Sequence, residues 1–414
     1  MTRRVVVTGL GTVNPVGLDT VETWNNLLNG RSGIARIQAF DPDEFNIDVK
    51  IAGEVKGFEP EKWIDRKEAR RLDRFGQFAV VAAKQAVAQA GLNLGDDIRY
   101  DVGSIIASGA GGLITIIEQE HVLIEKGYRR VSPFAVPMFM ANAAAGGISI
   151  DLGCWGPSFA VASACASSAD ALGLALDLIR NGRARAMIAG GSEATIIPVC
   201  IASFARAQAL TAKFNDAPEK ASRPFDMDRD GFVISEGAAV LVLEDEEFAR
   251  ARGARVLAEF AGYGVRSDGY HITAPEPEGR GATRAMLDAI ADAGAAKSDV
   301  VYINAHGTST PLNDKVESMV IAKVFDGRRV PTSSTKSMTG HLAGAAGALE
   351  ALVCVKVVET GWAPPTINYD TPDPECDIDC IPWKSREVGK GLVLSNSFGF
   401  GGHSSCLAFR PYMG

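Results

Sequence analysis

The chain has 414 residues, of which 46% are hydrophobic and 22% charged, a balance typical of globular proteins. This composition excludes a disordered chain, a collagen-like repeat and a small disulfide scaffold. The formal net charge of −8 argues against a nucleic-acid-binding surface. The sequence contains no run of about 18 apolar residues, so it predicts no membrane span. We therefore expect neither a nucleic-acid nor a membrane partner.

The N-terminus carries two arginines and then a short apolar run, which is too short for a signal peptide and predicts a first strand of a cytoplasmic protein. Short strands of Val, Ile and Ala then alternate with Ala-rich helices, as in α/β proteins. The predicted strands cover residues 5–8, 102–107, 186–190, 240–244, 301–304 and 392–396. A helix is predicted over residues 73–90, ending at Gly91, and a charged surface loop over residues 212–230.

Two early motifs invite a ligand-binding interpretation that their spacing does not favour. Thr8-Gly-Leu-Gly lacks the third glycine of a dinucleotide-binding turn, so we predict a plain strand-to-loop turn there. Cys376 and Cys380 have no nearby Cys/His pair to complete a zinc site. The seven scattered cysteines indicate free thiols, each buried and inert by default.

Two segments, residues 163–182 and 339–361, repeat one pattern. Each begins with a reactive residue type, continues as a helix of small residues and ends at glycine. Small residues let helices and sheets approach each other closely. The repeat predicts a duplicated α/β unit with an N-terminal half over residues 1–255 and a C-terminal half over residues 256–414.

Cys165 begins the first of these helices. The free N–H groups and positive dipole at a helix N-terminus lower a thiol pKa and can hold an oxyanion. The spacing fits a nucleophile about as well as a buried inert cysteine. His306 at a strand end and His341 beside Lys336 extend the pattern to a Cys–His–His site, with a structural role for each histidine as the alternative.

The last motif is a glycine-rich turn over residues 396–403, where backbone N–H groups can approach a ligand closely. Phe398 and Phe400 flank it, either as core aromatics or as a mobile apolar gate.

These motifs together resemble the β-ketoacyl-[acyl-carrier-protein] synthases, in particular the type II elongating enzyme of bacterial fatty acid synthesis. The resemblance rests on SACAS, NAHGTSTPLND, SSTKSMTGHLAGAAG and NSFGFGG, and it extends over essentially the whole chain. It implies the thiolase fold, with duplicated αβαβα halves in five layers, usually as a homodimer. It also implies an acyltransferase that condenses malonyl-acyl-carrier protein, by decarboxylation, with an enzyme-bound acyl thioester during fatty acid elongation.

The resemblance assigns a role to individual residues. Cys165 would accept the acyl chain, the backbone N–H groups of Cys165 and Phe400 would form the oxyanion hole, and His306 and His341 would stabilise the enolate. Lys336, with Glu350, would hold the polar network around them. The implied substrate-binding residues are Thr273, Thr308, Thr310, Ala110, Phe398 and His271. No cofactor is required beyond the phosphopantetheine of the carrier protein, and a structural monovalent cation is implied at Asn304, Glu350, Ser395 and Asn396.

An acidic carrier protein needs basic docking residues, although solvated charge is the ordinary meaning of a basic run. The positions that match the family's docking residues are Lys67, Arg70, Arg71, Arg129 and Arg130. One docking arginine is replaced by Gln208, with Arg206 two residues earlier.

Other departures are Ala110 at the acyl pocket, Ser235 in place of a usual glycine, and His403-Ser404 after the glycine turn. They leave chain length and pathway open, so polyketide or specialised-lipid assembly is an alternative. A non-catalytic chain-length partner typically lacks the nucleophilic cysteine. A thiolase typically needs a second cysteine near the C-terminus, for which Cys406 is the candidate, but the lysine–histidine motif favours the synthase.

Overall fold

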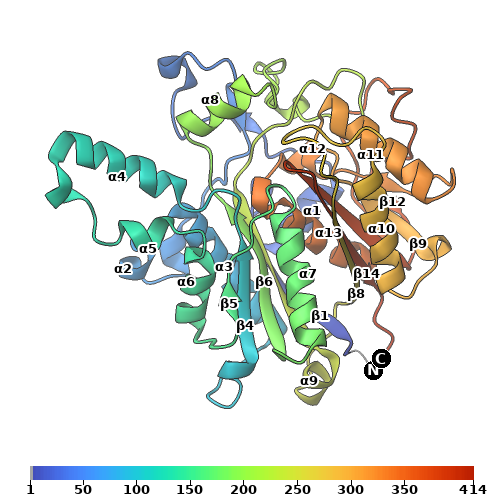
Figure 1. The fold of residues 1–414 in the computed structure, drawn as a ribbon, viewed down its shortest axis with the longest axis horizontal. Coiled ribbons are helices and arrows are strands. Elements are labelled where there is room, and N and C mark those ends of the chain that lie inside the picture. The colour runs from blue at the N-terminus through green and yellow to red at the C-terminus, as the bar shows by residue number, and fades with distance from the viewer. Residues whose placement is uncertain (1–2) are drawn as a thin grey trace.

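Ten strands form a mixed sheet through the molecule in the computed structural model, which describes residues 3–414 (Figure 1). Their order is β10-β9-β13-β14-β8-β1-β7-β6-β4-β5. In the N-terminal half the strands are β1 (Val5–Val13), β4 (Val102–Ala107), β5 (Ser158–Phe159), β6 (Ala186–Glu193) and β7 (Gly237–Asp245). In the C-terminal half they are β8 (Ala258–Ser267), β9 (Val300–Asn304), β10 (Thr332–Ser333), β13 (Leu392–Gly399) and β14 (His403–Arg410).

The two halves have the same strand topology. β5, β4 and β6 are parallel and are followed by antiparallel β7 and β1, whereas β10, β9 and β13 are parallel and are followed by antiparallel β14 and β8. The halves join where Val6 and Val7 of β1 pair with Glu259 and Ala258 of β8. The duplicated α/β unit predicted from the repeat is therefore confirmed, while the boundary between residues 255 and 256 stays a prediction.

The helices complete a five-layered arrangement. α3 and α6 pack on the outer face of the N-terminal strands, α10 and α11 cover the C-terminal strands, and α7 and α13 lie between the two sets (Figure 1). The helices of the first half are α1 (Thr20–Leu28), α2 (Arg66–Ala69), α3 (Arg74–Ala90), α4 (Leu113–Lys126), α5 (Ala135–Phe139), α6 (Ala143–Leu152), α7 (Ser167–Arg180), α8 (Pro198–Arg206) and α9 (Glu246–Ala251). Those of the second half are α10 (Arg280–Asp292), α11 (Pro311–Val324), α12 (Lys336–Thr339) and α13 (Ala346–Thr360).

Two short two-stranded sheets lie outside the main sheet: β2 (Ala35–Arg36) with β3 (Ile51–Ala52), and β11 (Trp362–Ala363) with β12 (Arg386–Glu387). Within residues 3–414, no helix combines the length and the apolar character that crossing a membrane requires.

The predicted turn after the first strand is wrong, because β1 continues through both glycines to Val13. A Cβ atom on Gly9 or Gly11 would lie 2.0 Å or 1.9 Å from a backbone oxygen of α3. The two glycines therefore let a helix pack directly on the strand. α3 itself agrees with its prediction: Asp73 caps its first turn, and Gly91 ends it in the left-handed conformation at φ 58°.

Candidate active site

Cys165 lies on a tight turn between β5 and α7. Ala164 before it adopts the left-handed conformation at φ 51°, and Ala166, the N-cap of α7, makes no side-chain capping bond. The first N–H groups of α7 are therefore free of a side-chain cap beside the thiol. Gly399 of the glycine-rich turn packs against this segment, where a Cβ atom would lie 2.6 Å from the carbonyl oxygen of Ser163.

The expected lowering of the Cys165 thiol pKa is wrong. Burial raises the pKa of this thiol to about 11, although the charge of Lys336 and a hydrogen bond from the backbone N–H of Phe400 act in the opposite direction. The loss of hydration, together with the charges of Glu193 and Glu350, outweighs these favourable contributions. Cys165 is thus a thiol at neutral pH, and the N–H of Phe400 already points at its sulfur.

His306 follows β9, and its position is fixed by two charged residues. Glu317 of α11 accepts the backbone N–H groups of His306 and Gly307 at 2.8 Å and 2.7 Å. Lys336 Nζ donates to the carbonyl oxygen of His306 at 2.7 Å and lies 3.4 Å from its Nδ1. Because an ammonium group only donates, Nδ1 acts as the acceptor and Nε2 carries the proton.

His341 lies edge-on to His306, with the ring centroids 5.4 Å apart and the planes at 85°. Its backbone N–H donates to Val233 at 2.8 Å, and both of its ring nitrogens are buried without a hydrogen-bond partner among residues 3–414. Burial and the Lys336 charge hold the pKa of both imidazoles well below 6.5. Both rings are therefore neutral, and each can offer one N–H to a ligand.

These groups meet in one cavity of about 380 Å³. Of the residues predicted to act, its lining includes Cys165, Thr273, His306, Thr308, Thr310, His341, Phe398 and Phe400. Lys336 lies behind the wall, 2% exposed and ion-paired with Glu350. His271 lies outside the lining and instead accepts the backbone N–H groups of Thr273 and Ala274 at 3.1 Å each.

Ala110 also lies outside the lining of this cavity, on an exposed turn after β4. Buried Glu193 accepts its backbone N–H at 3.2 Å and that of Gly109 at 2.7 Å. The charge of Glu193 also acts on the Cys165 thiol, so this turn lies near the nucleophile. The sequence did not identify Glu193 and Glu317 as part of the site, because an isolated acid on a strand or helix has no distinctive spacing.

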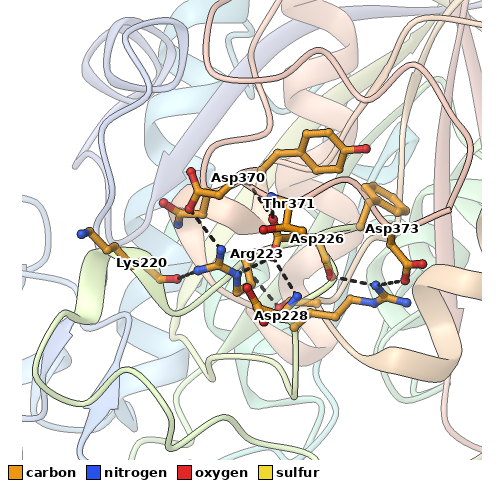
Figure 2. A network of polar contacts seen from close by, with 12 residues as sticks. Lys220, Arg223, Asp226, Asp228, Asp370, Thr371 and Asp373 are labelled. Atoms are coloured by element: carbon orange, nitrogen blue, oxygen red, sulfur yellow. Dashed lines mark hydrogen bonds and ion pairs between the residues drawn. The ribbon is translucent and has the colours of Figure 1, made fainter. Parts of the chain in front are cut away.

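Thr308 and Thr310 form one wall of the cavity, called here the threonine wall. A charged network supports this wall (Figure 2). Asp226 accepts Arg223 Nε at 2.9 Å and the backbone N–H groups of Asp370 and Thr371 at 2.7 Å each. Arg229 bonds Asp373 at 2.6 Å and donates to the carbonyl oxygen of Pro311 at 3.2 Å.

The predicted surface loop over residues 212–230 is wrong in part. Residues 221–226 belong to the predicted surface loop, but all six are buried. Opposite charges that pair and bond to backbone groups make this burial possible. Beyond them, Ser309 adopts φ 69°, held by the backbone N–H of Arg223 on its hydroxyl at 3.0 Å, between Thr308 and Thr310. The two threonine hydroxyls lie 2.9 Å apart.

The four residues of the implied cation site share one property. Each has a buried side-chain oxygen without a hydrogen-bond partner in the described chain; these atoms are Asn304 Oδ1, Glu350 Oε2, Ser395 Oγ and Asn396 Oδ1. Oxygens of this kind are ligands for a hard cation. The residues present therefore fit such an ion.

The basic residues divide into two groups. Lys67, Arg70 and Arg71 line a surface depression of about 530 Å³ beside Phe134, over which the Arg71 guanidinium stacks at 4.9 Å. Arg129 and Arg130 lie apart from this depression, on the short turn that follows α4. All of these side chains except Arg71, which is half-buried, belong to exposed residues.

A cysteine that can take an acyl group, facing neutral imidazoles that can stabilise an enolate, places the molecule among the thiolase-fold condensing enzymes. Comparison with known proteins gives the family. Residues 2–249 match the model of the β-ketoacyl synthase N-terminal domain and residues 257–370 that of the C-terminal domain. The chain belongs to the β-ketoacyl synthase family.

Three relatives illustrate the likeness. The 3-oxoacyl-[acyl-carrier-protein] synthase 2 of Synechocystis sp. is 48% identical over 99% of this chain and 98% of its own. The ishigamide ketosynthase/chain length factor superposes with a TM-score of 0.92 at 36% identity, with both chains fully covered. A ketosynthase bound to a hexaketide, in complex with its type II polyketide synthase acyl-carrier protein, gives 0.91 at 35% identity, again with both chains fully covered.

Proposed function

We propose that the protein condenses malonyl-acyl-carrier protein with an acyl group held on Cys165, giving 3-oxoacyl-acyl-carrier protein in fatty acid chain elongation. The observation that carries the proposal is the meeting of Cys165, His306 and His341 in one cavity. The full-length likeness to 3-oxoacyl-[acyl-carrier-protein] synthase 2 supports the pathway.

In the first half-reaction, Cys165 Sγ attacks the carbonyl carbon of the acyl thioester. The bond to the pantetheine sulfur breaks, and the thiol proton leaves with that sulfur, so charge balances. The N–H groups of Cys165 and Phe400 stabilise the oxyanion that forms as the acyl carbonyl is attacked. A thiol with a pKa of about 11 favours a transfer in which the proton leaves as the new bond forms.

In the second half-reaction, malonyl-carrier protein loses CO₂ and the remaining electron pair forms an enolate. His306 and His341 each donate an N–H to the enolate oxygen, and neutral imidazoles can do so without first losing a proton. The enolate carbon then attacks the acyl-Cys165 carbonyl, the carbon–sulfur bond breaks, and the cysteine leaves as a thiolate that takes up a proton from water. Lys336 fixes the His306 tautomer, because its ammonium group faces Nδ1 and leaves the proton on Nε2.

The carrier protein is the proposed partner. Thr273, Thr308 and Thr310 offer hydroxyls to its phosphopantetheine arm at the cavity lining, and Phe398 forms an apolar wall beside them. Lys67, Arg70 and Arg71, together with Arg129 and Arg130, are proposed to dock its acidic surface. The related ketosynthase seen in complex with its own carrier protein supports this arrangement.

We propose that the protein forms a homodimer through the β5 edge of the main sheet. β5 is the outermost strand of the N-terminal half, and large apolar side chains are exposed around it. Ile150 is 86%, Trp155 52% and Phe159 38% exposed. A second copy would cover this edge, and light scattering on the purified protein tests it. We also propose that the enzyme works in the cytoplasm, where its seven free cysteines would stay reduced.

A monovalent cation is proposed at the unpartnered oxygens of Asn304, Glu350, Ser395 and Asn396. Bound there, it would supply positive charge to a buried polar cluster. Thermal unfolding in KCl against choline chloride at equal ionic strength tests this, and identical midpoints would contradict it.

Although Ala110 lies outside the cavity lining, Glu193 holds its turn near Cys165, and Ala110 is proposed to leave space for medium and long acyl chains that extend past the cavity. Ala110→Ile should lower kcat/KM on long acyl-carrier proteins several-fold while sparing short ones, since each buried methylene is worth about 0.8 kcal/mol. An unchanged chain-length profile would contradict this role.

The decisive experiment supplies a panel of acyl-carrier proteins together with malonyl-carrier protein, and identifies the products by mass spectrometry. Fatty acid elongation predicts one condensation per acyl chain and no turnover with acyl-coenzyme A alone. The similarity in fold to the ketosynthase that is bound to a hexaketide favours polyketide assembly as the second candidate, which predicts repeated condensation.

A further inference from the structure

Asp170 of α7 is a buried acid that neither half-reaction uses. It is 7% exposed and lies just beyond the nucleophile, in the first turn of the helix. Its carboxylate accepts three hydrogen bonds, all from neutral hydroxyls: those of Ser163, Ser405 and Tyr263, the last at 2.8 Å. A charge-assisted bond of this kind is about twice as strong as one between neutral groups.

The three donors come from three segments around the reaction centre. Ser163 precedes Cys165 by two residues. Ser405 is on β14, after the turn that carries Phe400, and pairs with Ser397 of β13. Tyr263 is on β8, and its ring lies against Gly173 of α7, where a Cβ atom would be 2.4 Å from it.

Two of these bonds, from Tyr263 and Ser405, cross the boundary between the two halves. The sulfur of Cys165 belongs to the N-terminal half, but the Phe400 N–H that faces it comes from the C-terminal half. The contact is tight, because Gly399 has no room for a side chain against the nucleophile turn. A small shift of the β13–β14 hairpin therefore changes the distance between the thiol and its oxyanion donor.

We propose that Asp170 is a positioning residue: by holding Ser163 and Ser405 on one carboxylate, it fixes the spacing between Cys165 and the N–H of Phe400. The inference rests on the proposed acyl transfer to Cys165. It concerns the steps in which the carbonyl of the acyl group on Cys165 is attacked and not malonyl decarboxylation, since His306 and His341 belong to segments that Asp170 does not touch.

Asp170→Asn tests the proposal. The amide nitrogen donates instead of accepting, so at least one hydroxyl loses its acceptor and the bonds lose the negative charge that strengthens them, while the shape is kept. The rate of acyl adduct formation on Cys165, followed by intact-protein mass spectrometry, should fall about tenfold, with an unchanged KM for acyl-carrier protein. Malonyl decarboxylation, measured in a Cys165→Ala background, should stay within about twofold.

Asp177→Asn is the matched control, because it makes the same change at an exposed position of the same helix and should leave both rates unchanged. If Asp170→Asn does not fold, Ser405→Ala carries the test, since it removes only the bond to the oxyanion hairpin. Tyr263→Phe keeps the bonds of Ser163 and Ser405 and should remain closer to wild type.

An equal loss in both half-reactions, or Tyr263→Phe slowing acyl transfer as much as Ser405→Ala, would overturn the proposal. A wild-type protein that forms no acyl adduct would instead contradict the proposed function itself.

Discussion

The two central helices, α7 and α13, occupy equivalent places in the duplicated fold and carry different chemistry. Both begin without a side-chain cap, and they touch where Ser168 of α7 accepts the backbone N–H of Ala348 in α13 at 2.9 Å. Each has a buried acid in its first turns. Asp170 is surrounded by hydroxyls, whereas Glu350 is ion-paired with Lys336.

Duplication of the fold therefore did not duplicate the site. α7 begins just after Cys165, the proposed nucleophile, while α13 carries Glu350, which pairs with the lysine that sets the tautomer of His306. On the proposed mechanism, acyl transfer therefore depends on the start of α7 together with Phe400, and enolate formation depends on the C-terminal half. Single substitutions can break one function and spare the other.

Cys165→Ala should have the largest effect. It removes the acyl acceptor, so condensation and covalent acyl labelling should both be abolished, and alanine suits a turn among small residues, so the fold should survive. Intact-protein mass spectrometry after incubation with acyl-carrier protein measures this. An undiminished adduct on the variant would show that another residue is the acceptor.

His306→Ala and His341→Ala should each slow malonyl decarboxylation by about 10²–10³-fold, the usual scale for the loss of one oxyanion donor. Acyl transfer to Cys165 should suffer less. Measuring the two half-reactions separately for both variants tests the division between the helices. Equal losses in both would indicate a structural role for the histidines.

The buried histidines should also make stability depend on pH. Burial holds the pKa of His341 well below 6.5, so below pH 6.5 the unfolded chain binds a proton that the folded chain does not. The unfolding free energy should therefore fall as pH drops, by up to about 1.4 kcal/mol per pH unit for this residue. Urea unfolding of His341→Asn between pH 6 and 5 should show a slope smaller by that amount, whereas His121→Asn, at an exposed position, should match wild type.

Charge reversal at Arg70 and Arg71 touches neither helix and should have the smallest effect. It should raise KM for acyl-carrier protein about 3- to 10-fold and weaken the salt dependence, because exposed charges act mainly on encounter. Arg183→Glu, after the end of α7, is the control. A lower kcat at unchanged KM would contradict a docking role.

Much of this comparison could be predicted from the sequence. The apolar runs located the core strands, and the repeat of small-residue helices indicated the duplication. Both reflect local patterns that burial imposes along the chain. The Cys–His–His site followed from three residue types at strand ends and helix starts.

What the sequence left out depends on contacts between distant segments. The thiol pKa was predicted in the wrong direction, because the burial of Cys165 depends on walls supplied by both halves. Asp170 also bonds Tyr263 and Ser405, and Glu317 also bonds Asn396, groups far away along the chain that no local spacing marks. Gly9 and Gly11 were assigned to a turn, because their reason is a helix more than 70 residues later.

The charged network of Figure 2 has a consequence for synthesis on the ribosome. When the N-terminal half has emerged, Arg223 and Arg229 are present but Asp370 and Asp373, their partners at 3.1 Å and 2.6 Å, are not yet made. The nascent chain can complete β1 to β7, yet the network around residues 221–226 lacks these two carboxylates until the last part of the polypeptide arrives. The support of Thr308 and Thr310 is therefore complete only when translation is nearly finished.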